Sequence, residues 1–175
     1  MTESGYWVYG LSVEDIDYTL DLATRLVASH VAAYDARATR VRAENPEQAD
    51  DILDDFAHYT HVEAGYVWHY SLWRLQAVFE GLLVHHFLKG RKVSNRGGVG
   101  KKLDAMISAG YEVRPADREA LLAWAQLRNS LSHAPPERFR PGSLCEADVI
   151  EYAGLLRRLC SGWHASGVAG SLPGQ

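Results

Sequence analysis

The feature that most constrains the fold is a long helical pattern of apolar residues in the first half of the chain. Large apolar residues recur every three or four positions from Ile52 to Leu83. This period matches one stripe of an α-helix and predicts a helix that begins at Pro46, runs to about Leu88 and bends near Gly65. The apolar stripe is broad, which indicates burial on several sides or against a second subunit.

The same spacing, together with end signals, predicts the other helices. Ser12 is a suitable N-cap, Gly110 a suitable C-terminal residue, and Pro115 a suitable first helical residue. The predicted helices cover residues 12–44, 101–109, 115–133 and 146–163. Strand-type alternation and internal repeats are absent from the sequence, so we expect an all-α fold, an antiparallel bundle of four main helices with short additional helices.

Composition narrows the class of protein. A chain of 175 residues, 47% apolar and 23% charged, is typical of one globular domain, which we assign to residues 1–165 with a flexible tail at 166–175. An aromatic arm over residues 1–10 is expected to pack on the first helix or on a partner. A net charge of −4 argues against indiscriminate nucleic-acid binding, and the two cysteines form neither a disulfide framework nor a metal pair. Without a signal-like start or an apolar run of membrane length, we expect a soluble, cytoplasmic protein with no membrane contact.

The stretch Leu127–Pro136, LRNSLSHAPP, carries the most chemistry. Arg128 and His133 lie five residues apart near the end of a predicted helix, because Pro135 disfavours helical geometry at the residue before it. A guanidinium holds a phosphate and an imidazole moves a proton, so the pair suits phosphodiester chemistry without metal. Five α-helical residues correspond to a rotation of ~140°, so a second subunit or another helix must complete such a site.

The spacing alone is weak evidence, because Arg25 and His30 repeat it in RLVASH. That second pair lies within a long amphipathic run, whereas Arg128 is followed by Asn129 and His133 ends its helix. The alternative interpretation is that arginine and histidine are ordinary favourable cations at a helix C-terminus.

A basic segment precedes the motif. KGRKVSNRGGVGKK has six basic residues, no acidic residue and four glycines, so it contributes +6 to a chain of net charge −4. We predict a flexible loop that contacts an RNA backbone, or else a solvated connection. The predicted phosphate contacts are Lys89, Arg91, Lys92, Arg96, Lys101 and Lys102, with Arg138 and Arg140 after the motif. GGVGKK resembles a P-loop only superficially: Asn95 replaces its first glycine, and no strand precedes it.

Other polar residues lie on the long second helix. Glu80, within AVFEGLL, is a carboxylate in apolar sequence that either orients Arg128 or is solvated. His58 and His61 have the i, i+3 spacing of a metal pair, but no second ligand pair accompanies them or His69. We therefore expect these histidines to lie on the surface or in an aromatic cluster, and we predict no metal and no cofactor.

The string RNSLSH at the end of a helix resembles the Arg-x4-His signature of the HEPN domain family, and WRLQAVFEGLLVHHFL resembles the second helix of such domains. The resemblance covers roughly residues 71–160. It implies a homodimer in which two Arg-x4-His helices form one composite site. The implied activity is metal-independent endonucleolytic cleavage of RNA, with Arg128, Asn129 and His133 as catalytic residues.

Many HEPN domains resemble toxins or phage-defence effectors, which implies an antitoxin or regulatory partner. One subgroup has a tyrosine two residues after the histidine as a target for modification, but this chain has Pro135 there. Two alternatives remain open: a non-catalytic HEPN-like module that binds RNA, nucleotide or protein, and a metal-dependent helical enzyme that uses the histidines of the second helix.

Overall fold

The computed structural model describes residues 12–91, 93, 97–133 and 144–167, and the regular structure within these ranges is helical throughout. Its elements are α1 (Glu14–Glu44), α2 (Ala49–Leu82), the π-helical turn η1 (Leu83–Phe87), α3 (Val99–Ser108), α4 (Pro115–His133) and α5 (Glu146–Ala165). The predicted all-α class is confirmed. The expected N-terminal arm and residues 168–175 of the expected tail lie outside the described ranges. No described helix combines the length and apolarity needed to cross a membrane.

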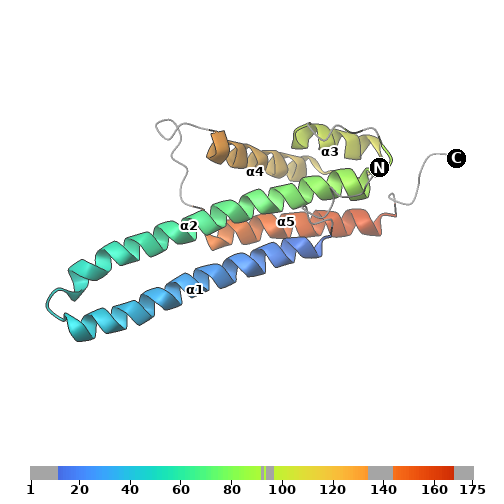
Figure 1. Ribbon diagram of the computed structural model, residues 1–175. Helices are drawn as coiled ribbons and strands as arrows, with labels where there is room; N and C mark the ends of the chain where they lie inside the picture. The colour runs from blue at the N-terminus through green and yellow to red at the C-terminus, as the bar shows by residue number, and fades with distance from the viewer. Residues whose placement is uncertain (1–11, 92, 94–96, 134–143, 168–175) are drawn as a thin grey trace, which may run out of the picture.

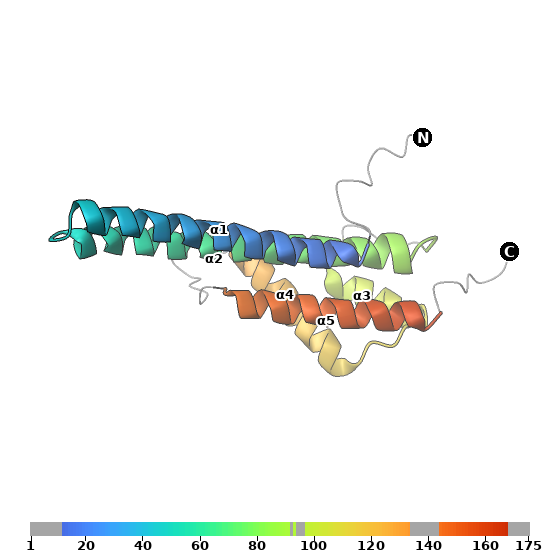
Figure 2. The same ribbon diagram turned by 90° about the horizontal axis from the view of Figure 1, so that it is seen from below.

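The two longest helices, α1 and α2, form an antiparallel hairpin (Figure 1). Helix α5 lies beside the half of this hairpin nearer the termini and runs in the same direction as α2, whereas the connecting end of the hairpin extends beyond it (Figures 1 and 2). Helix α4 crosses α5 obliquely in Figure 2, so the four main helices are not all aligned as in a regular bundle.

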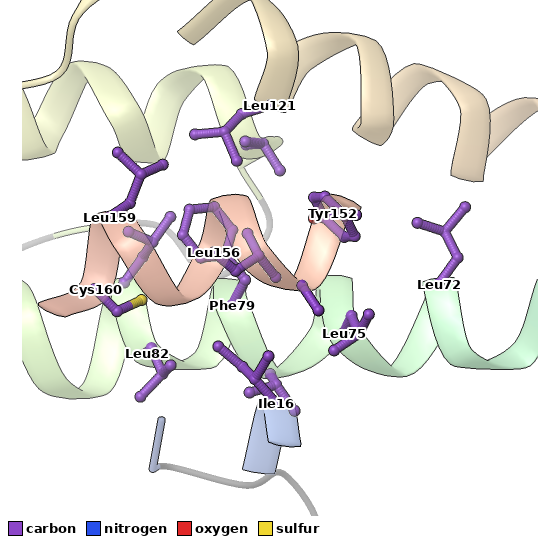
Figure 3. Packing of buried hydrophobic residues seen from close by; sticks show 14 of the residues in the cluster. Ile16, Leu72, Leu75, Phe79, Leu82, Leu121, Tyr152, Leu156, Leu159 and Cys160 are labelled. Atoms are coloured by element: carbon purple, nitrogen blue, oxygen red, sulfur yellow. The ribbon is translucent and has the colours of Figure 1, made fainter. Parts of the chain in front are cut away.

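The core lies where α1, α2 and α5 meet under α3 and α4. Buried residues recur at helical spacing on α2 and on α5, and Figure 3 shows Ile16 of α1, Phe79 of α2 and Leu156 of α5 in one cluster. Each fully buried large side chain contributes about 1.5–3 kcal/mol of hydrophobic stabilisation, so this cluster holds the helices together. Its members include Ile16, Leu72, Leu75, Phe79, Leu82, Leu103, Met106, Leu121, Tyr152 and Leu156.

Several helix ends differ from the predicted positions. Residues 46–48 form a turn, so α2 begins at Ala49 and not at Pro46; the Gln48 N–H donates to the Asn45 carbonyl at 3.2 Å. Helix α3 begins two residues before Lys101, and α5 ends two residues after Trp163. The α-helical part of α2 continues through Gly65 and changes to a π turn after Leu82.

The end of α3 is a Schellman motif. The Tyr111 N–H donates to the Met106 carbonyl at 3.1 Å and the Gly110 N–H to the Ile107 carbonyl at 2.9 Å. Gly110 has a φ of 95°, which is favourable only for glycine. This motif, together with the buried Leu103 and Met106, sets the position of α3 against the core.

Candidate active site

Helix α4 is anchored at its start and carries the Arg-x4-His motif at its end. Asp117 in its first turn accepts hydrogen bonds from Arg158 of α5, at 2.6 Å to Oδ1, and from Arg114, at 2.8 Å to Oδ2. Further along, Trp124 stacks on Tyr152 with ring centroids 4.9 Å apart. The helix runs from Pro115 to His133 as predicted. These contacts fix its first half and leave its last turn at the surface.

Arg128 lies half-buried beside the carboxylate of Glu80. Its Nη2 is 3.7 Å from Glu80 Oε1, and its Nη1 donates to Asn129 Oδ1 at 2.9 Å. The Arg128 side chain is 31% exposed, so the guanidinium keeps access to solvent. Of the two interpretations of Glu80, the structure favours the one in which this carboxylate orients Arg128.

Lys102 differs from its predicted role as a phosphate contact. It lies within the predicted helix 101–109, now α3, but its side chain is only 3% exposed. Its ammonium forms an ion pair with Glu80 Oε2 and donates to the Gly97 carbonyl at 2.7 Å. Since Leu103 and Met106 draw this face of α3 into the core, Lys102 is a buried partner of Glu80 and not an exposed phosphate contact.

A hydrogen-bond chain holds Glu80 from the other side. Gln76 Nε2 donates to Glu80 Oε1 at 3.0 Å, and the Tyr152 hydroxyl donates to Gln76 Oε1. Burial, with the charge of Glu80 as a second cause, raises the pKa of Tyr152, so the phenol remains a donor at neutral pH. Glu80 is therefore fixed by Gln76, Lys102 and Arg128 together.

His133 is exposed in the last turn of α4 and borders a pocket of about 580 Å³. Asn129, four residues earlier on the same helix face, lines this pocket, as do Gly98 and Gly100 at the start of α3. A smaller pocket of about 230 Å³ is lined by Glu80, Arg128 and Asn129. Asn129 therefore borders both pockets.

Arg128 and His133 line different pockets within one chain. Arg128 faces Glu80, whereas His133 lines the larger pocket with Asn129. This arrangement follows from the ~140° rotation between residues five apart on an α-helix. Within one copy, the two groups therefore lie at separate pockets.

The remaining predicted phosphate contacts divide into two sets. Lys89 and Arg91 are exposed directly after η1, and Lys101 is exposed in the first turns of α3. The second set lies outside the described residues: Lys92, Arg96, Arg138 and Arg140.

The histidines of α2 show no metal-binding arrangement. Within the described ranges, no group of three or more His, Cys, Asp or Glu side chains is placed to hold a metal ion. His58 lies edge-on to Tyr59 and His69 edge-on to Tyr66, with ring centroids 5.8 and 6.4 Å apart. Burial lowers the pKa of His69. These contacts match the expected aromatic surroundings.

Sequence reasoning did not single out His85. This residue lies on η1 and lines a third pocket, of about 340 Å³, with Glu80, Lys102 and Arg128. The available signal was a pair of consecutive histidines at the end of an otherwise apolar helix. Helical periodicity does not show which of the two faces the site, because the π turn changes the register locally.

Comparison with known proteins identifies no family for this chain. A scan against protein-family models, a search of curated proteins and a search of solved structures each give no match. The geometry of the site and the short motif of α4 are therefore the indications of function.

Proposed function

We propose that the protein is a metal-independent endoribonuclease of the HEPN type that acts as a homodimer. One observation carries this proposal: Arg128 is partly exposed beside a carboxylate that a buried lysine already neutralises. Two cations therefore face one carboxylate, and net positive charge remains next to the pocket that Asn129 and His133 line. An accessible guanidinium with an imidazole nearby suits an RNA phosphodiester.

The reaction uses the neighbouring 2′-hydroxyl of RNA as nucleophile. His133 removes the proton of this hydroxyl or protonates the departing 5′-oxygen, and Arg128 stabilises the charge on the phosphate oxygens. Asn129 orients Arg128 through its 2.9 Å hydrogen bond. The O2′–P bond forms as the P–O5′ bond breaks, which leaves a 2′,3′-cyclic phosphate and a 5′-hydroxyl.

A second copy completes the site in this proposal. Since Arg128 and His133 of one chain line separate pockets, the histidine of one copy serves the arginine of the other across a two-fold interface. In biological terms we propose a cytoplasmic toxin or phage-defence effector with a cognate antitoxin or regulatory protein.

The central experiment is cleavage of total RNA and tRNA by the purified protein in EDTA, with mapping of the new ends. We expect cyclic phosphate ends from the wild type and a loss of at least ~100-fold in rate for both Arg128→Ala and His133→Ala. Intact RNA with wild-type protein would contradict the nuclease proposal.

Mixing the two variants tests the composite site. Co-refolding Arg128→Ala with His133→Ala produces heterodimers in which one site combines an intact arginine with an intact histidine. If each site draws on both copies, the mixture recovers roughly a quarter of wild-type activity, because about half the dimers are mixed and each has one complete site. If each site belongs to one chain, the mixture stays inactive.

The alternative function is a HEPN-like module that binds RNA, nucleotide or a protein partner without cutting. The separation of Arg128 and His133 within one chain favours it, because phosphate binding by Arg128 needs no nearby imidazole. RNA binding by a wild type that leaves the RNA intact is the result expected for this alternative.

A further inference from the structure

The pocket that His85 lines shares no lining residue with the pocket of His133. It has a volume of about 340 Å³, and four elements form its walls. Glu80 comes from α2, His85 from η1, Lys102 from α3 and Arg128 from α4. Segments far apart in the sequence thus bring three basic side chains and one carboxylate to the same cavity.

The π turn gives the two consecutive histidines different surroundings. The Leu88 N–H donates to the Leu83 carbonyl at 2.9 Å, an i→i+5 bond that widens the helix at this point. His85 lines the pocket, whereas His86 packs against Phe87 at 4.8 Å and stacks on His164 at 5.9 Å between ring centroids. Single π turns inside α-helices occur frequently at functional sites.

The charges around the pocket favour an anion. Lys102 and Arg128 together exceed the charge of Glu80 by one, before any contribution from His85. The Glu80 carboxylate already accepts a hydrogen bond from Gln76, pairs with Lys102, and lies 3.7 Å from Arg128 Nη2. Because its charge is compensated, the carboxylate opposes an incoming anion less than an isolated carboxylate would.

We infer that this pocket is a second phosphate subsite, which holds a phosphate of the RNA strand next to the one being cleaved. His85 and Arg128 contact the phosphate, and Lys102 supplies fixed positive charge behind them. Arg128 suits both positions because a guanidinium has five N–H donors, enough to reach two neighbouring phosphates. The inference rests on the proposed ribonuclease function and adds the class of ligand that the pocket takes.

The test measures RNA binding without cleavage. The full chain carrying His133→Ala is titrated with a fluorescent ten-nucleotide RNA of mixed sequence, and Kd is obtained from anisotropy at several salt concentrations. The test variant adds His85→Gln, and the matched control adds His86→Gln. Circular dichroism melting shows that both variants remain folded.

We expect His85→Gln to weaken RNA binding about tenfold, because a hydrogen bond to a charged phosphate is lost. The salt dependence of log Kd should become shallower by about 0.7, the value for one lost phosphate contact on a single strand. The Kd of the His86→Gln variant should stay within twofold of that of the His133→Ala parent. Equal Kd values for the two variants, or loss of binding in both, would overturn the inference.

This outcome is separable from that of the proposed function. If the wild type does not cut RNA but His85→Gln alone weakens binding, the nuclease proposal fails and the phosphate subsite stands. If the wild type cuts RNA and His85→Gln binds like His86→Gln, the nuclease proposal stands and the subsite fails.

Discussion

Two helices of this chain carry an arginine followed five residues later by a histidine, and their surroundings differ. On α1, Arg25 pairs with Asp21 at 3.0 Å and His30 lies 3.5 Å from Glu63, so each basic residue has a carboxylate of its own. On α4, Arg128 shares Glu80 with the buried Lys102. The two pairs have the same spacing, but net positive charge remains only around Arg128.

A short motif therefore acquires its chemical meaning from the charges around it. The Arg25 and Asp21 side chains are both more than 60% exposed, and such surface pairs contribute little to stability. Around Arg128, the carboxylate is compensated by a neighbour that cannot move into solvent, which leaves net positive charge at a pocket. The contrast between α1 and α4 therefore depends on Lys102 as much as on the motif.

The largest expected effect comes from removing the buried ammonium with Lys102→Met. Glu80 then keeps Gln76 and Arg128 alone, and the free energy of unfolding should fall by about 3 kcal/mol, because a partly buried carboxylate loses its ion-pair partner. Arg128 then becomes the sole counter-ion of Glu80, as Arg25 is of Asp21. Because this removes the net positive charge at the site, RNA cleavage should fall as well.

Urea denaturation and a cleavage assay check both effects of Lys102→Met. The matched control is Lys101→Met, an exposed neighbour on the same helix, which should change stability by less than about 0.5 kcal/mol. Equal stability of the two variants would remove the proposed role of Lys102.

The second effect concerns the anchor of α4, where Asp117 is only 8% exposed beside Arg158 of α5. The hydrogen bonds and charge of Arg158, with Arg114, lower the pKa of Asp117 below its ordinary value of 3.8, against the effect of burial. A carboxyl whose folded-state pKa is lowered stabilises the fold above the ordinary pKa, and this contribution is lost as the pH falls through the lowered value.

Asp117→Asn should therefore destabilise the protein by about 2 kcal/mol at pH 7, with a difference from wild type that shrinks below pH 3.8. Urea denaturation at pH 7, 5 and 3 measures this dependence. Asp104→Asn, which removes an exposed carboxylate paired with Arg118 at 3.0 Å, serves as the control. If the loss in free energy of unfolding caused by Asp117→Asn stayed constant from pH 7 to pH 3, the lowered pKa of Asp117 would be contradicted.

The smallest effect is expected for the α1 pair. Arg25→Ala and His30→Ala should each change the free energy of unfolding by no more than about 1 kcal/mol, the range of exposed ion pairs, and leave RNA cleavage within twofold of wild type. Cleavage assays beside Arg128→Ala and His133→Ala check this expectation. A large loss of cleavage in the α1 variants would break the distinction between the two pairs.

Helix positions were largely predictable because local signals specify them. Both ends of α4 agree with the prediction, since proline favours the first position of a helix and Pro135 disfavours helical geometry at Ala134. Helix α2 begins at Ala49, three residues after the predicted start, because Pro46 belongs to the turn that follows Asn45. The π turn was missed, since no apolar spacing distinguishes it from α-helix.

The candidate site was predictable only in part. Glu80 attracted notice as a carboxylate in apolar sequence, and it does lie beside Arg128. The predicted phosphate contact at Lys102 is wrong, because charge composition cannot reveal which lysine of a run is buried. His85 was overlooked because Lys102 and Arg128, which line the same pocket, come from other helices.

Local sequence patterns specify the helical class and the ends of most helices. They also place arginine and histidine about 7.5 Å apart along one helix. These properties depend only on residues within a few positions of each other. Tertiary structure decided which charges compensate each other. Lys102 is 22 residues from Glu80, and Tyr152 is 76 residues from Gln76, so only packing of α2 against α3, α4 and α5 brings them together. The electrostatic difference between two identical spacings arises from that packing, since Coulomb interactions depend on distance in space and on burial from water.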